Sequence, residues 1–245
     1  MINKQLVRLN KFLSELGYCS RREADKLIEQ ERVTVNGLIP KTGTKVSIDD
    51  EVVVDGEYVN KPKKIAERFV YIAFNKPRGI VCTTDSKSEK NNIVDYINHK
   101  KRIFPIGRLD KPSEGLIFLT NDGDIVNKIL RSKNNHEKEY IVTVDKPINS
   151  TFIKKMSDGV PILGTKTKRC KVEKINQYKF KIVLTEGMNR QIRRMCEFLD
   201  YKVKSLQRVR IMNVKLDVGI GKWRDLTDQE ITQIKQMVSS SAKTK

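Results

Sequence analysis

The chain has 245 residues, of which 38% are hydrophobic and 32% are charged, and its net charge is +19. This length suits one large domain or two smaller ones with a buried core, and no apolar run reaches the ~20 residues that a membrane span needs. The excess of positive charge predicts a polyanionic partner, first of all nucleic acid. A basic surface that serves only solubility is the alternative.

Residues that bind metals or nucleotides are scarce and unclustered. The four cysteines form no Cys-x-x-Cys pair and the chain has two histidines, which argues against a zinc site. Free thiols and the lack of a signal peptide fit a cytoplasmic protein. No Gly-x-x-x-x-Gly-Lys loop is present, so ATP or GTP chemistry is not expected. The sequence therefore predicts no cofactor and no metal.

Residues 1–60 are predicted to form a small module of two helices and short strands. Apolar residues at i, i+3, i+4 and i+7 indicate a helix over residues 6–16, and Gly17 ends it. Ser20 and Glu23 have the spacing of a capping box for a second helix. The stretches VTVNG and EVVVDG are predicted strands that end in Asn-Gly or Asp-Gly turns. A charged stretch with a proline follows at 61–68 and is interpreted as a linker.

The stretch RLNKFLSELGYCSRREADKLIEQERVTVNG resembles the S4 RNA-binding domain, and the resemblance covers roughly residues 7–65. It implies that an exposed basic face of the two helices binds structured RNA. An ordinary solvated helix face is the alternative, because residues 1–60 have 9 basic and 10 acidic side chains. The acidic residues gather at 49–57, away from the helices, which favours RNA. The residues of the basic face are Arg8, Lys11, Arg21, Arg22 and Lys26.

Residues 69–238 are predicted to form an α+β domain, with a disordered tail at 239–245. Strands are expected in RFVYIAFNKPRGIVCT, EYIVTV, KFKIVLT and NVKLDV, and helices over 124–131 and 188–199. Because strands and helices do not alternate, a mostly antiparallel mixed sheet flanked by helices is favoured over a doubly wound one. Residues 165–215 have 15 basic and 4 acidic side chains, so the excess charge belongs to this domain.

A rigid loop, GRLDKPSEG, holds a candidate functional carboxylate at Asp110. Gly107 and Gly115 permit backbone angles that other residues resist, Pro112 stiffens the turn, and apolar segments lie on both sides. An isolated Asp before Lys-Pro usually closes a turn or caps a helix. The loop alone therefore does not assign a reaction to Asp110.

Four motifs in order resemble those of the pseudouridine synthases of the RsuA/RluA superfamily. They are NKPRG at 75–79, GRLDKPSEGLIFLTNDG at 107–123, KEY at 138–140 and EGMNRQIRRM at 186–195. Together with the S4-like module they are most similar to the RsuA/RluB/RluE/RluF branch, and to its members that act on large-subunit ribosomal RNA. The resemblance implies isomerisation of a uridine in 23S rRNA to pseudouridine by a monomer, with a tRNA uridine as a second target left open. A sibling target in 23S or 16S rRNA, or a non-catalytic rRNA-binding protein, is the alternative.

By resemblance, Asp110 is the nucleophile of the isomerisation and Arg193 is the cation that keeps it charged. Burial raises the pKa of a carboxyl group and a nearby cation opposes that effect. Helical periodicity places Arg193 on the flank of an apolar stripe, from which it can lean inward. The same periodicity places Arg190 and Arg194 away from the core, where they are expected to contact RNA phosphates. Full solvation of all three arginines is the alternative.

Tyr140 is implied by the resemblance to contact a flipped-out base and to serve in proton transfer, although most tyrosines in strands are core aromatics. Lys76, Arg78 and Arg108 are expected to position the loop and the RNA phosphates. Pairing of Arg108 with a carboxylate other than Asp110 stays open. The sequence does not choose between attack at C1′ of the sugar and attack at C6 of the base.

Overall fold

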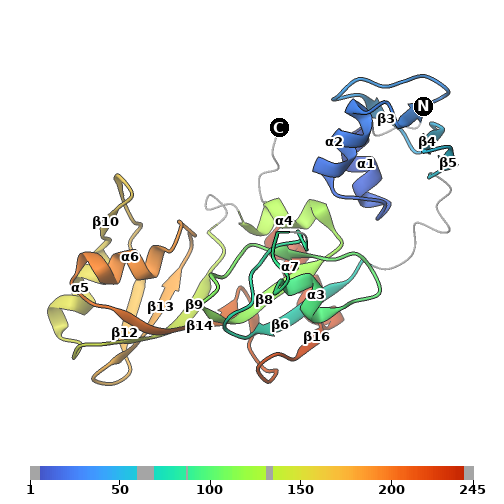
Figure 1. Cartoon of the computed structure of the whole chain (residues 1–245). Coiled ribbons are helices and arrows are strands. Elements are labelled where there is room, and N and C mark those ends of the chain that lie inside the picture. Colours follow the sequence, from blue (N-terminus) through green and yellow to red (C-terminus); the bar gives the residue numbers. More distant parts are fainter. Residues whose placement is uncertain (1–5, 60–68, 87, 131–134, 240–245) are drawn as a thin grey trace. The chain divides into compact units, whose positions relative to one another are not determined.

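The computed structural model describes residues 6–59, 69–86, 88–130 and 135–239. These belong to two compact units, Met1–Phe69 and Val70–Lys245 (Figure 1). The expected linker at 61–68 and the tail residues 240–245 lie outside the described residues.

The first unit contains the two expected helices and two small sheets. Its elements are β1 (Val7–Arg8), α1 (Leu9–Glu15), α2 (Arg21–Glu29), β2 (Val33–Val35), β3 (Lys45–Val46), β4 (Val52–Val54) and β5 (Glu57–Tyr58). The first helix begins later than its periodicity predicts, because β1 pairs with β3 instead. The Oγ of Ser20 accepts a hydrogen bond from the Glu23 N–H at 3.2 Å, as a helix cap does. Asp55 and Gly56 have φ of 51° and 83° and close the β4–β5 hairpin.

The second unit is built on a nine-stranded mixed sheet. The strands lie in the order β12 (Lys171–Lys174), β13 (Lys179–Leu184), β9 (Lys138–Val144), β14 (Val203–Ile211), β8 (Glu114–Thr120), β6 (Tyr71–Lys76) and β16 (Trp223–Asp225). In addition, β7 (Phe104–Ile106) pairs with β8 and β15 (Val214–Lys215) pairs with β14. The β14–β8 pair is parallel and the other pairs are antiparallel. The α+β class with a mostly antiparallel sheet is therefore confirmed. A separate hairpin joins β10 (Pro161–Ile162) to β11 (Thr165–Lys166).

Helices cover both faces of this sheet. On one face α3 (Ile93–Ile97), α5 (Ser150–Asp158) and α6 (Gln191–Phe198) pack with Ile72 and Phe74 of β6. On the other face α4 (Gly123–Leu130) and α7 (Asp228–Met237) pack with Tyr71 and Ala73. Successive residues of a strand point to opposite faces, so Ile72, Ala73 and Phe74 of β6 are all apolar because both faces of the strand are buried. Figure 1 shows α5 and α6 at the β12–β13 end of the sheet.

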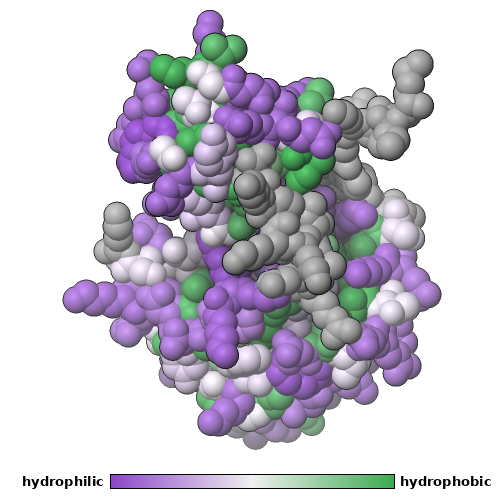
Figure 2. Space-filling model, turned by 90° about the vertical axis from the view of Figure 1, so that its right-hand side faces the viewer, coloured by the Kyte–Doolittle hydropathy of each residue, from purple (hydrophilic) through white to green (hydrophobic). Residues whose placement is uncertain are grey.

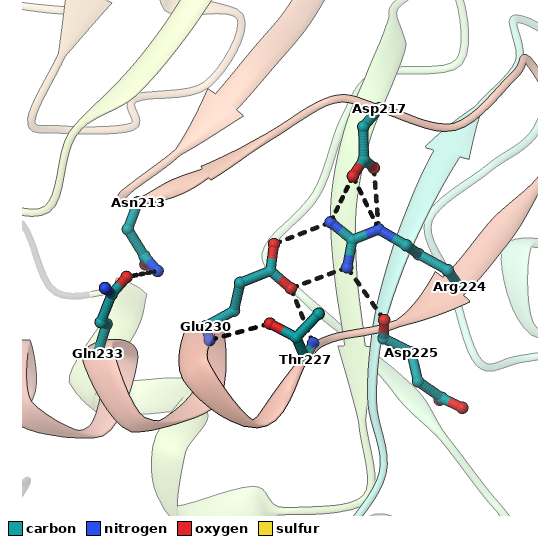
Figure 3. A network of polar contacts seen from close by, with 7 residues as sticks. All are labelled: Asn213, Asp217, Arg224, Asp225, Thr227, Glu230 and Gln233. Atoms are coloured by element: carbon teal, nitrogen blue, oxygen red, sulfur yellow. Dashed lines mark hydrogen bonds and ion pairs between the residues drawn. The ribbon is translucent and has the colours of Figure 1, made fainter.

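The helix α7 is fixed by a network around Arg224 of β16 (Figure 3). The guanidinium of Arg224 pairs with Asp217 at 2.7 Å and with Glu230 of α7 at 2.8 Å. Thr227 and Glu230 form a capping box at the start of the helix. The adjacent cation lowers the pKa of Glu230. The network thus ties the last helix to the edge of the sheet.

The face of the molecule that Figure 2 shows is mostly hydrophilic, with hydrophobic side chains scattered among polar ones. No helix among the described residues is long and apolar enough to cross a membrane.

Candidate active site

The loop with Asp110 joins the antiparallel strands β7 and β8. Its close fit to β14 explains why a glycine stands at 115: a Cβ there would lie 2.3 Å from the carbonyl oxygen of Arg208, and φ is 105°. The N–H of Ser113 donates to the carbonyl of Asp110 at 2.9 Å, and the N–H of Gly79 donates to the carbonyl of Lys111 at 2.8 Å. The NKPRG motif and the GRLD motif are thereby held together, as a fixed support for one carboxylate.

The carboxylate of Asp110 is 36% exposed and faces a cation at the start of α6. That cation is Arg190, whose Nη1 lies 3.9 Å from Oδ2 of Asp110. Helical periodicity directs Arg190 away from the core, but Arg190 is the N-cap residue and has left-handed backbone angles, φ 50° and ψ 33°. Helical periodicity does not predict the direction of the Arg190 side chain, because this residue does not have helical backbone angles.

Arg193 lies inside the protein, as its flank position predicts, and it is 9% exposed. Its guanidinium donates to the carbonyl of Pro112 at 3.3 Å, to Oγ of Ser113 at 3.2 Å and to the carbonyl of Val203 at 3.3 Å. Arg193 therefore holds the backbone beside Asp110 through hydrogen bonds. The cation that forms an ion pair with the Asp110 carboxylate is Arg190. Burial, and next the charge of Arg190, lower the pKa of Arg193.

A cavity of about 760 Å³ opens beside this loop, within the size range of small-ligand sites. Polar side chains from the loop, β9, α6 and β14 line it together with apolar ones. The charged and phenolic side chains among the lining residues are Arg108, Asp110, Lys111, Lys138, Tyr140, Glu186, Arg190, Arg193 and Arg208. The structure thus brings Asp110, Tyr140 and Arg193 into one cavity.

Tyr140 is 8% exposed and belongs both to the cavity wall and to the core of the sheet. The guanidinium carbon of Arg208 lies 6.0 Å from its ring centroid, within reach of a cation–π interaction. Arg208 was not identified from the sequence. Its position became clear only from the sheet, in which Arg208 of β14 pairs directly with Tyr140 of β9.

The other predicted RNA contacts in this unit have different surroundings. Arg108 is exposed and lines the cavity. The side chain of Arg78 pairs with Glu114 at 3.0 Å, and Arg194 bonds to Asn189 at 3.1 Å and 3.2 Å. Lys76 was expected to position the loop and the RNA phosphates, and its burial is compatible with the first role but not with the second. Its ammonium is fully buried and donates to the carbonyls of Pro77 and Ile80, both at 2.9 Å, so it shapes the NKPRG turn from inside.

The basic face proposed for the first unit is largely open to solvent. Arg8, Arg21, Arg22 and Lys26 are exposed. Lys11 is partly buried and pairs with Glu15 one helical turn away at 3.3 Å.

No group of three or more His, Cys, Asp or Glu side chains stands close enough to hold a metal ion within the described ranges. The cavity lining itself offers two carboxylates, a phenol and several cations.

Known proteins resemble this chain in both units. The family described as RNA pseudouridylate synthase matches residues 70–198, and the S4 domain family matches residues 7–52. Dual-specificity RNA pseudouridine synthase RluF of Escherichia coli (strain K12) is 57% identical over 243 residues, which cover 99% of this chain and 83% of that protein. An uncharacterized RNA pseudouridine synthase of Aquifex aeolicus (strain VF5) is 34% identical over 95% of this chain and 98% of its own length. A crystal structure of a pseudouridylate synthase is 32% identical, with a TM-score of 0.68, over 93% of this chain and 99% of that one.

Proposed function

Because this chain belongs to the RNA pseudouridylate synthase family and is a pseudouridine synthase, we propose that it isomerises one uridine of 23S rRNA through Asp110. The observation that supports this assignment is the position of Asp110: a half-exposed carboxylate, on a loop fixed at both ends, beside a cavity that also holds Tyr140.

The target uridine leaves its stack and enters the cavity, since its reacting atoms are out of reach within a helix. The Asp110 carboxylate then drives cleavage of the bond between N1 of uracil and C1′ of ribose, by attack at C1′ or at C6. The freed ring turns and C5 forms the new bond to C1′. The bond between Asp110 and the substrate breaks and regenerates the carboxylate, C5 loses its proton and N1 gains one. In this proposal Tyr140 contacts the ring and assists the proton transfer.

The cations near Asp110 have separate roles in this proposal. Arg190 stabilises the charged carboxylate through the 3.9 Å ion pair. Arg193 holds Pro112 and Ser113, and with them the loop, in place. Arg78, Arg108 and Arg194 are left to contact RNA phosphates, together with the basic face of the S4 unit.

A tRNA uridine is the proposed second target, and the phrase "dual-specificity" in the name of the E. coli relative supports two RNA targets. The protein is proposed to act as a monomer in the cytoplasm. Mapping pseudouridine in 23S rRNA, 16S rRNA and tRNA from cells with and without the protein tests the targets. A site in 23S rRNA should vanish in its absence, and an unchanged 23S map contradicts the assignment.

Asp110→Asn tests the nucleophile. Asn has nearly the same size, so the loop survives, but it lacks the charge that attacks, and turnover should fall by at least about 10³-fold. RNA binding should persist or tighten slightly, since one repulsion between the carboxylate and phosphate disappears. Tritium release from C5-labelled uridine in RNA measures the step. Substantial tritium release by the Asp110→Asn variant would rule out Asp110 as the nucleophile.

A further inference from the structure

Two buried cations in the cavity wall have no counter-ion among the residues that the structure describes. Lys138 and Arg208 are 8% and 4% exposed. The ammonium of Lys138 donates to the carbonyl of His136 at 3.1 Å, and Nε of Arg208 donates to the carbonyl of Leu116 at 2.6 Å. Within the described residues, neither cation lies within ion-pair distance of a carboxylate, and Nη2 of Arg208 has no hydrogen-bond partner. Buried charges without a counter-ion are costly, which indicates that an anion completes the site.

The register of the sheet places these cations beside the aromatic ring of Tyr140. Lys138 and Tyr140 are two residues apart on β9, so both point to the same face. Arg208 stands directly opposite Tyr140 on β14, with its guanidinium over the ring. All three residues line the cavity that contains Asp110. They form one surface, which we call the cationic wall: Lys138, Tyr140 and Arg208.

A flipped uridine can present two anionic groups to the cationic wall. One is a backbone phosphate, which concentrates its charge and holds water strongly. The other is the uracil ring, which retains the electron pair of the broken N1–C1′ bond and spreads it over a planar ring. Apolar side chains share the cavity lining, and they suit a flat, delocalised anion better than a hydrated phosphate. These side chains are Ile106, Phe118, Leu184, Leu206 and Ile211.

We propose that Lys138 and Arg208 hold the negative charge of the uracil ring between cleavage of the N1–C1′ bond and formation of the C5–C1′ bond. This proposal rests on the proposed reaction at Asp110, since that step creates the anion. Either route of attack places negative charge on the ring, so both routes need such a wall. The charge disappears when the ring gives an electron pair to C1′, C5 releases its proton and N1 takes one up. Donors fixed where charge develops stabilise it without reorganising.

The protonation of Lys138 sets a pH limit for this role. Burial, and next the charge of Arg208, lower the pKa of Lys138 to about 8. The neighbouring His136 has a lowered pKa from burial and then from Lys138, so it adds little positive charge at pH 8. The residues that pair with Lys138 in β13 and β14, Leu184 and Ile211, are apolar. Activity should therefore fall as the pH rises above about 8, because Lys138 loses its proton.

Substitution of Lys138 in the full-length protein tests the proposal on target RNA under single-turnover conditions. Lys138→Met should lower the rate by about 10²-fold or more, while RNA affinity changes by less than about threefold. Lys138→Arg should restore the rate to within about tenfold of the wild type and abolish the fall above pH 8. Arg210→Met is the matched control, because Arg210 lies on the same strand as Arg208 but is neutralised by Glu137 and Glu139. Its rate should stay within about threefold of the wild type.

RNA with neutral methylphosphonate linkages on either side of the target uridine shows whether the cationic wall binds the uracil ring or a backbone phosphate. If the cationic wall holds the ring, these linkages slow the wild type and Lys138→Met equally. If the linkages slow the wild type alone, the wall binds phosphate and the proposal is wrong. The proposal is also overturned if Lys138→Met reacts at the wild-type rate. The Asp110→Asn variant in the same assay shows independently whether the nucleophile is correctly assigned. Should Lys138→Met not fold, Lys138→Arg decides: an unchanged fall above pH 8 overturns the proposal.

Discussion

At the scale of single residues, burial distinguishes the three arginines of the EGMNRQIRRM motif. Arg193 is buried and fixed by three acceptors, Arg190 is partly exposed beside the carboxylate, and Arg194 bonds to Asn189 at the surface. All three stand within five positions of one motif, yet each has a different environment. Their substitutions should therefore have different consequences.

Arg193→Lys should reduce turnover far more than Arg194→Lys. An ammonium cannot replace a planar fork that reaches Pro112, Ser113 and Val203 at once, so the loop below Asp110 loosens. We expect a loss of about 10²-fold for Arg193→Lys and less than about threefold for Arg194→Lys. Tritium-release rates at saturating RNA measure both. Equal rates for the two variants would contradict the role assigned to Arg193.

Lys138→Met should make the protein more stable at pH 7. Because the folded state lowers the pKa of Lys138 from 10.5 to about 8, burying its charge costs stability fully below pH 8, and the cost disappears between about pH 8 and 10.5. Removing the amine should raise the free energy of unfolding by about 1 to 3 kcal/mol at pH 7. Urea unfolding at pH 7 and pH 9.5 should show the difference from the wild type shrinking at the higher pH. A variant less stable than the wild type at pH 7 would argue against this cost.

At the scale of elements, the parallel contact between β8 and β14 assembles the site. Glu114 and Gly115 of β8 pair with Gln207 and Arg208 of β14, so the end of the Asp110 loop lies beside the cationic wall. Backbone atoms, which cannot move aside as a side chain can, crowd the position of a Cβ at residue 115.

Gly115→Ala should destabilise the second unit by roughly 3 kcal/mol or more, because the methyl group would meet the Arg208 carbonyl and the φ of 105° is unfavourable. Gly164→Ala is the control. Gly164 has a φ of 73° with nothing within 4 Å of its Cβ position, so it should lose only about 1–2 kcal/mol. Thermal unfolding of both variants measures the contrast, and similar losses would show that crowding at Gly115 is unimportant.

Local sequence patterns predicted the elements that show a helical stripe with a cap, a turn dipeptide or a continuous apolar run. The stripe and cap of α2, the Asp-Gly turn after β4 and the apolar run of β6 all appear where the sequence indicates them. The nine-residue strand β14 was missed, because VKSLQRVRI interrupts its apolar residues with Lys, Gln and Arg. These polar residues are explained only by the cavity and the neighbouring strands, which no local pattern describes.

The candidate site, too, was only partly predictable from the sequence. Motif resemblance assigned Asp110, Tyr140 and Arg193, and all three line one cavity. It could not reveal that Arg190 faces Asp110, because a left-handed residue at the start of α6 breaks the periodicity. Nor could it reveal that Lys76 is buried, since its acceptors are backbone carbonyls.

At the scale of the whole molecule, charge is distributed unequally between the two units. Residues 1–60 are nearly neutral, whereas residues 165–215 have a net charge of +11. The second unit should therefore supply most of the sequence-independent attraction to RNA, and the S4 unit should supply placement on a particular structure.

RNA binding should depend steeply on salt. Several phosphate contacts each release about one counter-ion, so log affinity against log salt concentration should have a slope several units negative. Fluorescence anisotropy with labelled rRNA fragments between about 50 and 200 mM salt measures the slope. A flat plot would show that the basic surface of residues 165–215 is not the RNA footprint.

The pairing of β8 with β14 also dictates when the enzyme becomes active during its own synthesis. Arg208 bonds to Leu116, a partner 92 positions earlier in the chain. At about 5–20 residues per second, a ribosome needs roughly 5–20 s to make that interval. Throughout it, the nascent protein already contains its S4 unit and the Asp110 loop but lacks Arg208, and with it a complete cationic wall. A growing chain can therefore engage RNA before it is able to modify any.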